Sequence, residues 1–472
     1  MGVVTFNSKL SFLNVDNTFR IDYKYNSFLN SGGWNLFKSN SKKLIPLKEI
    51  LIPFYENFEF EDDIEYSGVP TGKDYLDQFG EIISTQLITK EEHPDRLKYK
   101  VDSDCVLISS LKGARIPALS FDIDLSNYVF SNAFYVFKIN ESWSKKFILH
   151  LLRTEKIKNI IDNNIYRGIG ISAYKEEDLL KVLIPKIDYQ KQLKIVELIE
   201  PLETEITTLK NSKLKPLDII NSVFGEEFCF EWESYEKLKK QKKYSSNLNE
   251  FANNIDCRMG LKFHNLAGKY LHSFLVSKTI KKVKDYIAEP IALGKSVSPS
   301  NYDEDGEFFY IAMSNIKTYA FDPEDCKKVS EDYSKSNLKK TVQKGDILLA
   351  RSGEGTIGKV ALIDDEDLNA IFADFTQRIR LTNYNTLFAY YYFRSEFFQY
   401  LVYTHKKGLG NNTNIFPSQI QEFPIPDWDD IKQTEIVAKI KTQIDAQNII
   451  DIQIEQKQQQ INDIIESAIK TE

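Results

Sequence analysis

The sequence predicts two globular domains in tandem, each followed by a helical segment. Three observations predict this arrangement: a length of 472 residues, self-similarity at an offset near 240 residues, and a change from strand-like to helical periodicity late in each half. A chain of this length exceeds what one hydrophobic core usually supports. Because the offset is about half of the chain, each half should contain one complete copy of the same architecture.

The composition is typical of a globular protein. Hydrophobic residues make up 42%, aromatic residues 13% and charged residues 27% of the chain, which excludes a disordered or fibrous protein. The formal net charge is −7 and the pI is about 5.6. Residues 255–427 contain 22 Lys and Arg against 22 Asp and Glu. Any surface that binds nucleic acid must therefore be a local patch.

Two landmarks in the first part of each half establish the repeat. Residues 20–26 (RIDYKYN) return as 258–264 (RMGLKFH) at an offset of 238, with Arg, Lys and an aromatic residue at the same spacing. Residues 101–108 return as 342–349 at an offset of 241. Both segments of the second landmark have the pattern of a strand and lead into a loop that contains glycine.

A third landmark shares the offset of 241. An Ile-Pro pair, a Lys-Gln pair and an Ile-Val pair occur in this order within residues 184–196 and again within 425–437. After each Ile-Pro pair, apolar residues recur in steps of four and three, the a/d stripe of a coiled coil. The stripes are Ile195, Ile199, Leu202, Ile206 and Leu209 in the first copy, and Ile436, Ile440, Ile450, Ile454, Ile461, Ile465 and Ala468 in the second.

The first helical spacer should be irregular. Pro201 falls inside its stripe and Pro216 follows it, so the helix should bend or break there unless neighbouring contacts compensate. Residues 226–249 are then expected to be a linker. Its lysine run, residues 237–243 (KLKKQKK), is interpreted as a solvated loop, with an auxiliary phosphate contact as the alternative.

The cysteines and the N-terminus predict a cytoplasmic protein. The four cysteines stand far apart without a CxxC pair, so we expect buried thiols in a reducing compartment and neither a zinc ribbon nor a disulfide framework. The first residues lack a basic stretch followed by an apolar core, and no run of about 18 apolar residues occurs. We expect neither secretion nor membrane spanning.

Enzyme signatures fail when their chemistry is tested. Residues 353–360 (GEGTIGKV) fit GxxxxGK, but Val360 stands where a P-loop needs Ser or Thr for magnesium, and residues 361–363 look like a strand. The Pro-Pro pair of DNA amino-methyltransferases, Gly-x-Ser-x-Gly and HExxH are all absent. Residues 323–327 (PEDCK) place acids near a lysine, but in a polar turn. We therefore expect no catalytic residue, metal ligand or cofactor in this chain.

Glycine-bearing loops with basic residues are the segments best suited to bind DNA. Glycine lets the backbone approach phosphate, arginine can bind guanine, and asparagine or glutamine can bind adenine. Loops 112–115 and 351–359 form one matching pair. Loops 166–172 and 406–414 form another, for which an ordinary turn before a helix is the alternative; for the residues of the first landmark, the alternative is an internal ion pair. The candidate DNA contacts are Arg20, Lys24, Lys112, Arg115, Arg167, Arg258, Lys262, Arg351, Ser352, Lys359, Lys406, Lys407, Asn411, Asn412 and Thr413.

Together, the repeat, loop 351–359, the glycine-rich turn before each Ile-Pro pair and the terminal heptads resemble the specificity subunit of type I restriction-modification enzymes over nearly the whole chain. The resemblance implies α/β (mixed α+β) target-recognition domains, two in tandem, whose helical spacers form an antiparallel coiled coil in a pseudo-two-fold internal repeat. Each domain would read one half of a bipartite DNA target. The expected parts are a recognition domain at 1–185, a spacer and linker at 186–250, a recognition domain at 251–427 and a spacer at 428–472.

The resemblance also implies partners for a chain that is itself non-catalytic. Two methyltransferase subunits would bring S-adenosylmethionine, and restriction/translocase subunits would use ATP and magnesium. The second copy departs from the first at Gly260, where the first has Asp22. Two alternatives stay open: a paralogous DNA-recognition subunit of another modification or phage-defence system, and a coiled-coil interaction protein that does not bind DNA.

Overall fold

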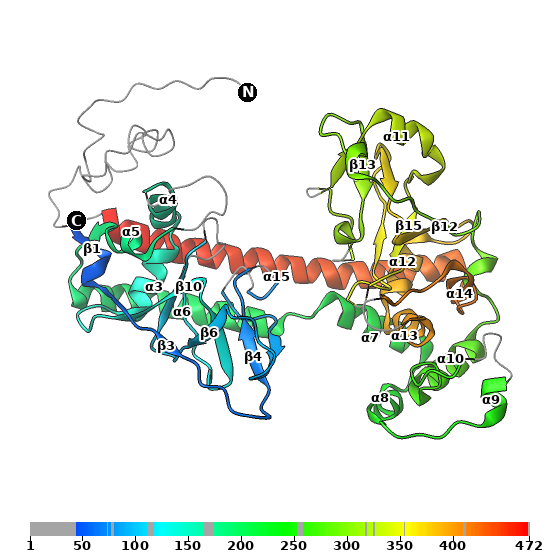
Figure 1. Cartoon of the computed structure of the whole chain (residues 1–472), viewed down its shortest axis with the longest axis horizontal. Helices are drawn as coiled ribbons and strands as arrows, with labels where there is room; N and C mark the ends of the chain where they lie inside the picture. The colour runs from blue at the N-terminus through cyan, green and yellow to red at the C-terminus, as the bar shows by residue number, and fades with distance from the viewer. Residues whose placement is uncertain are drawn as a thin grey trace. The chain divides into compact units, whose positions relative to one another are not determined.

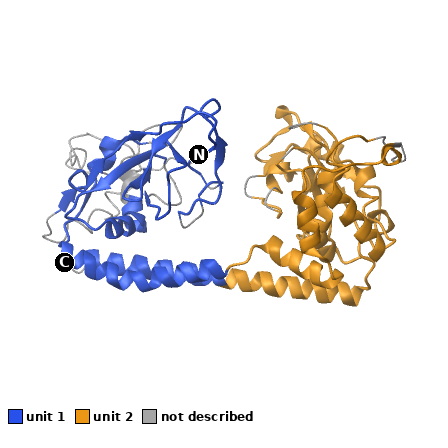
Figure 2. Ribbon diagram, turned by 90° about the horizontal axis from the view of Figure 1, so that it is seen from below, with its two compact units in different colours: residues 1–212, 450–472 blue, residues 213–449 orange. Residues whose placement is uncertain are grey.

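A computed structural model of the chain describes residues 44–72, 74–76, 80–111, 118–164, 174–252, 258–316, 319–323, 326–353, 355–408 and 412–470. The chain divides into two compact units (Figure 2). Unit 1 comprises residues 1–212 and 450–472, and unit 2 comprises residues 213–449. The helices of the described part include none that is long and apolar enough to cross a membrane. The boundaries between the recognition domains and the spacers stay predictions.

In the part that the structure describes, unit 1 combines three sheets with helices (Figure 1). The strand orders are β1-β11, β2-β10-β7-β8 and β3-β6-β9-β4-β5. The strands are β1 (Leu44–Pro46), β2 (Leu51–Pro53), β3 (Glu56–Asn57), β4 (Tyr66–Val69), β5 (Gln86–Ile88), β6 (Leu97–Lys100), β7 (Val106–Ser109), β8 (Ala118–Leu119), β9 (Tyr128–Ser131), β10 (Phe134–Ile139) and β11 (Leu183–Pro185). The helices are α3 (Lys145–Arg153), α4 (Glu155–Asn164), α5 (Glu176–Leu180), α6 (Tyr189–Ser212) and the last part of α15 (Asp430–Lys470).

The described residues of unit 2 form two sheets, with strand orders β12-β18-β15-β16 and β14-β13-β17. The strands are β12 (Ala292–Leu293), β13 (Phe308–Ile311), β14 (Lys327–Val329), β15 (Ile347–Ala350), β16 (Val360–Leu362), β17 (Ala370–Phe372) and β18 (Thr376–Ile379). The helices are α7 (Pro216–Phe228), α8 (Trp232–Lys240), α9 (Leu248–Ala252), α10 (Leu266–Lys278), α11 (Glu331–Ser336), α12 (Thr386–Arg394), α13 (Glu396–His405), α14 (Pro417–Ile420) and the first part of α15.

The two units repeat one topology. The order β2-β10-β7-β8 corresponds to β12-β18-β15-β16, with antiparallel pairs throughout. The order β5-β4-β9 corresponds to β14-β13-β17, and in both the first pair is antiparallel and the second parallel. The helices that follow begin 241 residues apart, at Lys145 and Thr386, Glu155 and Glu396, Glu176 and Pro417, and Tyr189 and Asp430. The predicted tandem repeat of mixed α/β domains and helical spacers is confirmed.

Both predicted heptad stripes are packed in cores. In unit 1, Ile199 and Ile206 of α6 lie in the same buried cluster as Ile454 and Ile465 of α15, and Glu205 of α6 pairs with Lys457 of α15. In unit 2, the buried cluster contains Ile220, Val223 and Phe224 of α7 with Ile436 and Ile440 of α15. Burial of these apolar side chains is the main attraction between the spacer helices.

The spacer helices of unit 2 are antiparallel. The backbone N–H of Leu214, just before α7, donates to Gln447 at 2.8 Å. Near the end of α7, Glu226 pairs with Lys439 at 2.7 Å. The partner number on α15 falls as the residue number on α7 rises, which defines opposite directions.

The first spacer is interrupted at Pro216 and not at Pro201. Helix α6 is continuous through Pro201, whereas α7 begins with Pro216 at its first position, where a missing N–H costs no hydrogen bond. Ile199 and Ile206 are buried on either side of Pro201. Their packing is the compensating contact that keeps α6 intact.

Two expectations about residues 226–249 and the cysteines are wrong in part. Residues 232–240 form helix α8 and are not a linker. Trp232 and Tyr235 lie one turn apart and pack into the aromatic core of unit 2, which turns a lysine-rich segment into a docked helix. Cys105 is buried as expected, but Cys229 is exposed, because it caps α7 in the left-handed conformation at the surface.

A buried glutamine fastens α6 to the recognition domain of unit 1. Gln192 is 0% exposed. Its Oε1 accepts a hydrogen bond of 2.8 Å from the backbone N–H of Ser144, and its Nε2 donates to the Ile187 carbonyl at 2.9 Å. Ser144 is the N-cap of α3, whose side chain accepts from the first turn. The spacer helix is thus bonded to the start of the first helix that follows the sheets.

Gln433 makes the same bonds in unit 2, one repeat of 241 residues later. It is 3% exposed, accepts from the backbone N–H of Asn385 at 2.9 Å and donates to the Trp428 carbonyl at 2.6 Å. Asn385 is the N-cap of α12. The Lys-Gln pair of the third landmark is therefore explained by this attachment.

We expect Gln433→Leu to weaken the attachment of α15 to α12. The substitution leaves a buried N–H and a buried carbonyl without partners, which costs about 2 to 4 kcal/mol. Hydrogen exchange at the amides of α12 should accelerate, while the amides of α3 in unit 1 keep their wild-type protection. Thr442→Leu, at an exposed position of the same helix, is the control. Equal acceleration in both variants would contradict the role given to Gln433.

Candidate nucleic-acid interface

Arg351 lies at the start of the loop that follows strand β15. Its Nε donates to the Asp374 carbonyl at 2.7 Å, and its Nη1 donates to Oδ1 of Asn414 at 3.4 Å. Both acceptors are neutral, so the guanidinium is held in place while its full positive charge remains. A guanidinium fixed in this way is suited to a bidentate contact with guanine or phosphate.

The loops 351–358 and 406–414 are joined by backbone hydrogen bonds. The N–H of Ile415 donates to the Arg351 carbonyl at 2.9 Å, and the N–H of Gly353 donates to the Thr413 carbonyl at 3.3 Å. Lys407 and Asn414 exchange two backbone hydrogen bonds of 2.7 Å. These bonds make one continuous surface from two loops that are far apart in the sequence.

Two glycines are required by the geometry of this surface. Gly358 has φ +89°, and a Cβ there would meet Oε1 of Gln399 at 2.6 Å. Gln399 of α13 donates to the Gly358 carbonyl at 2.7 Å, which fixes the loop on the helix. Gly408 has φ +105°, and a Cβ there would lie 2.2 Å from the Asn412 carbonyl oxygen. A side chain at either position would displace the loop backbone.

Arg258 holds residues 258–263, which form one wall of the interface, against the end of α13. Its Nη1 and Nη2 donate at 2.8 Å to the carbonyls of His405 and Lys406, at the end of α13, and its guanidinium lies 4.4 Å from the centre of the Phe263 ring. These bonds satisfy carbonyls that a helix leaves unpaired at its C-terminus. The geometry therefore favours a structural role for Arg258.

Two lysines converge on one tyrosine in the same wall. Nζ of Lys262 lies 5.2 Å and Nζ of Lys406 lies 5.5 Å from the ring centre of Tyr403, distances typical of cation–π contacts. A cavity of about 430 Å³ opens here, lined by Arg258, Met259, Gly260, Leu261, Lys262, Phe263, Lys406, Lys407, Gly408 and Thr413. The wall thus joins the first landmark of the repeat to loop 406–414.

The structure brings most of the candidate residues of the second copy together. Around the joined loops and the cavity lie Arg258, Lys262, Arg351, Ser352, Lys406, Lys407, Asn412 and Thr413. Thr413 is 3% exposed and contributes its carbonyl to the loop junction. Lys359 lies at the far end of loop 351–359, 5.9 Å from the ring of Tyr319. Outside the described residues lie Arg20, Lys24, Lys112, Arg115, Arg167 and Asn411.

The strand prediction that argued against a P-loop is confirmed. Residues 360–362, directly after the GxxxxGK match, form β16. A P-loop leads into a helix whose N-terminus holds phosphate. In the described part of the chain, no group of three His, Cys, Asp or Glu is placed to hold a metal ion.

The sequence reasoning missed two arginines and one asparagine. Arg394 ends α12 and lies 5.3 Å from the Tyr319 ring that Lys359 also approaches. Arg153, one repeat of 241 residues earlier, ends α3 and donates to the Ala118 carbonyl at 3.0 Å. The offset of the repeat could have identified this pair. Asn414 holds Arg351, a contact between loops that no sequence pattern marks.

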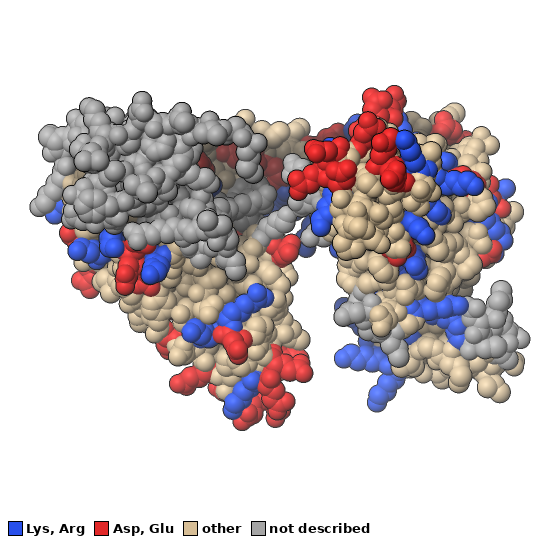
Figure 3. Space-filling view, turned by 45° about the horizontal axis from the view of Figure 1, so that its top comes forward, with Lys and Arg blue, Asp and Glu red and all other residues tan. Residues whose placement is uncertain are grey.

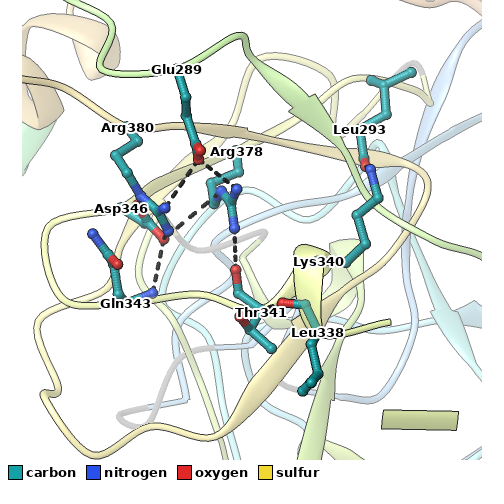
Figure 4. A network of polar contacts seen from close by, with 9 residues as sticks. All are labelled: Glu289, Leu293, Leu338, Lys340, Thr341, Gln343, Asp346, Arg378 and Arg380. Atoms are coloured by element: carbon teal, nitrogen blue, oxygen red, sulfur yellow. Dashed lines mark hydrogen bonds and ion pairs between the residues drawn. The ribbon is translucent and has the colours of Figure 1, made fainter. Parts of the chain in front are cut away.

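A buried carboxylate supports the strand that carries Arg351 (Figure 4). Asp346, 0% exposed, precedes β15 and accepts from Nε and Nη2 of Arg380 at 2.7 and 2.8 Å. These bonds raise the pKa of Arg380. Arg378 lies beside this pair and donates to Glu289 at 2.6 Å. The network fixes the start of β15 against β18.

We expect Asp346→Ala to destabilise unit 2. Removing one partner of a buried ion pair leaves an uncompensated charge and costs about 3 kcal/mol or more. The measurement is hydrogen exchange in β15 and β18, with β7 and β10 of unit 1 as the internal reference. Asp364→Ala, an exposed acid in the turn after β16, should leave exchange unchanged; a comparable loss of protection there would refute the expectation.

His405 makes the stability of unit 2 dependent on pH. Burial lowers the pKa of His405 to about 4, although a hydrogen bond to the Leu401 carbonyl raises it; the charge of Arg258 lowers it further. The pKa in the unfolded chain is about 6.5, so the unfolded state binds the proton more readily between these two values. Through His405, the free energy of unfolding is therefore unchanged above pH 6.5 and decreases progressively as the pH falls towards 4.

We expect the unfolding free energy of unit 2 to decrease between pH 6.5 and 4 by up to about 3 kcal/mol through His405. His405→Gln should flatten this part of the profile, because glutamine does not titrate. Denaturant unfolding followed by hydrogen exchange at several pH values measures the slope. His93→Gln, in unit 1, is the matched control; an unchanged slope in His405→Gln would rule out the assignment.

The fold and the site define a class: a protein with two tandem α/β domains and helical spacers, whose loops in unit 2 present basic and amide side chains. Residues 278–463 match the family model described as type I restriction modification DNA specificity domain. The match covers 186 of the 472 residues, so this part of the chain is similar to the DNA specificity domain of type I restriction-modification enzymes. A comparison with curated proteins found no match.

Three solved structures are similar along most of the chain. One, from work on complex assembly and conformational transition of the type I R-M system, has 16% identity and a TM-score of 0.43, and the match covers 92% of this chain and 98% of that chain. The HsdS subunit from Thermoanaerobacter tengcongensis has 15% identity and a TM-score of 0.33, with 91% and 96% covered. The S subunit from M. genitalium has 12% identity and a TM-score of 0.34, with 91% and 96% covered.

Proposed function

We propose that this chain recognises a bipartite DNA target, one half with each recognition domain, and brings methyltransferase and restriction subunits to it. The observation that carries this proposal is the interface of unit 2, where Arg351 is held by neutral acceptors, one of them Asn414, to which the half-buried Lys407 is joined by backbone hydrogen bonds. Arginine is the side chain that most often reads guanine, and nearby lysines provide phosphate contacts. The repeated topology supports an equivalent reader in unit 1.

In this proposal the chain positions DNA and its partners perform the chemistry. Methyltransferase subunits bind S-adenosylmethionine, and restriction/translocase subunits use ATP and magnesium. The chain itself holds no cofactor and catalyses no step. It acts in the cytoplasm, where its DNA substrate is found. Two methyltransferase subunits suit a recognition subunit with two copies of one fold.

Methylation mapping tests the role of the chain as the determinant of specificity. DNA from cells that express the chain with its neighbouring methyltransferase is sequenced by a long-read method that detects modified bases. We expect a split motif that is absent when the methyltransferase is expressed alone. Absence of any motif despite a verified complex would overturn the proposed function.

Arg351→Ala should change one half of that motif. Loss of a bidentate base contact reduces discrimination by about 1 to 3 kcal/mol, so methylation should spread to targets with other bases in the half read by unit 2. The half read by unit 1 should stay the same. Arg351→Lys should behave similarly, since lysine lacks the planar pair of donors.

Lys335→Ala is the matched control for charge, because Lys335 lies on α11 in an exposed ion pair with Glu331. It should leave the motif intact. An unaltered motif in Arg351→Ala would remove Arg351 from the set of base-reading residues. The other loop residues would then be tested in the same assay.

A further inference from the structure

The lysine run, residues 237–243, lies on the surface of unit 2 at the end of helix α8. Residues 232–243 contain five lysines and two glutamates, in a chain whose net charge is −7. These residues precede the region 278–463 that matches the specificity-domain family. Their role is therefore not part of what the family match describes.

Aromatic contacts fix α8 on the body of unit 2. Tyr235 is 0% exposed, and its hydroxyl donates to Glu396 of α13 at 2.8 Å. The Trp232 ring packs on Gly225 of α7, where a Cβ would meet Nε1 at 2.2 Å. Phe230 lies with its ring centre 4.9 Å from that of Phe397. With one face docked so firmly, α8 holds the opposite face towards solvent.

Four lysines of the run are exposed and make no ion pair in the described part of the chain; they are Lys237, Lys240, Lys242 and Lys243. Lys239 differs, because it pairs with Glu396 at 2.8 Å and Glu236 at 3.2 Å. Basic residues in the last turn of a helix are often explained by the helix dipole. Helix α8 ends at Lys240, so the dipole does not account for Lys242 and Lys243.

The lysine run leads directly to the candidate interface. The hydroxyl of Tyr244 donates to the Leu261 carbonyl, which belongs to the wall of the cavity. Tyr235 and Tyr400 have ring centres 5.4 Å apart, and Tyr400 and Tyr403 are also 5.4 Å apart. Tyr403 is the ring that Lys262 and Lys406 approach. In Figure 3, blue side chains lie on the lower part of unit 2, with no red visible among them.

We propose that these four lysines, the α8 patch, bind the phosphate backbone of duplex DNA next to the half-site that unit 2 reads. This inference rests on the proposed function of the interface and adds a sequence-independent contact to it. Exposed lysines without carboxylate partners displace condensed counterions from DNA, and this release strengthens binding at low salt. The patch therefore contributes affinity and leaves the choice of sequence to the loops.

The test measures affinity for duplex DNA over a range of KCl concentrations. The full chain is used in complex with the methyltransferase of the mapping experiment, with one labelled duplex that carries the mapped motif and one that lacks it. The patch variant is Lys237→Gln, Lys240→Gln, Lys242→Gln and Lys243→Gln combined. The slope of log affinity against log salt should become shallower by about 0.9 for each phosphate that the variant no longer neutralises, hence by roughly 2 to 4. Both duplexes should be affected, and the methylated motif should remain the same.

Two further variants separate the patch from general effects. A control combines Lys327→Gln, Lys335→Gln, Lys339→Gln and Lys344→Gln, four exposed lysines elsewhere in unit 2, with the same change in net charge. It should keep the wild-type slope. A Lys→Arg version of the patch should also keep it, because charge is preserved, and circular dichroism verifies folding.

The outcomes distinguish this inference from the proposed function. An unchanged slope in the patch variant would overturn the inference and leave the loops as the readers of sequence. An equally shallow slope in the control would also overturn it, because net charge and not the patch would explain the effect. A mapped motif that disappears only in loop variants, with a shallower slope only in the patch variant, supports both assignments.

Discussion

Two buried glutamine side chains, one in each unit, fasten the spacer helices to their recognition domains, and the position of the interface in unit 2 depends on this attachment. Gln433 accepts from the N-cap of α12 while it donates to the chain just before α15. A buried amide group that lacks one of these partners costs free energy, so the two hydrogen bonds hold α12 and α15 in a fixed relative position. In unit 2 the attachment continues from α12 to α13, where Gln399 fixes the Gly358 turn. The same end of α13 receives Arg258. The loop surface is thus held by helices that are themselves held by the spacer.

Much of the architecture could be predicted because it depends on local periodicity. The repeat offset, the strands at residues 106–109 and 347–350, and the heptad residues of both spacers follow from patterns that one face of an element must show when it is buried. The buried glutamines were visible as a recurring Lys-Gln pair, but their purpose was not, since their partners lie 48 residues away. The recurring pair therefore indicated where the spacer helix is attached, but not which hydrogen bonds attach it.

The sequence-based predictions that the structure contradicts are wrong for physical reasons that a sequence pattern does not contain. A proline inside a helix predicts a break because it removes one backbone hydrogen bond. In α6 the burial of Ile199 and Ile206 outweighs that loss, and the helix continues. A lysine-rich segment predicts a loop because it is hydrophilic. Residues 232–240 instead form helix α8, because Trp232 and Tyr235 pack in the core of unit 2. The role of Asn414 as a hydrogen-bond acceptor for Arg351 is visible only in the folded structure, where two loops that are distant in the sequence meet. In each case contacts made in the folded state reverse a local preference.

The charge distribution explains how an acidic chain can present a positive face. Carboxylates and guanidinium groups are paired where the fold needs support, as in Asp346 with Arg380, and such a pair cancels its own field. Arg351 is oriented instead by a carbonyl and an amide oxygen. Neutral acceptors fix the direction of a cation without cancelling its charge, so the charge still acts on a nearby phosphate. Equal numbers of acidic and basic residues within residues 255–427 are therefore compatible with DNA binding, because what matters is which cations are held by neutral groups.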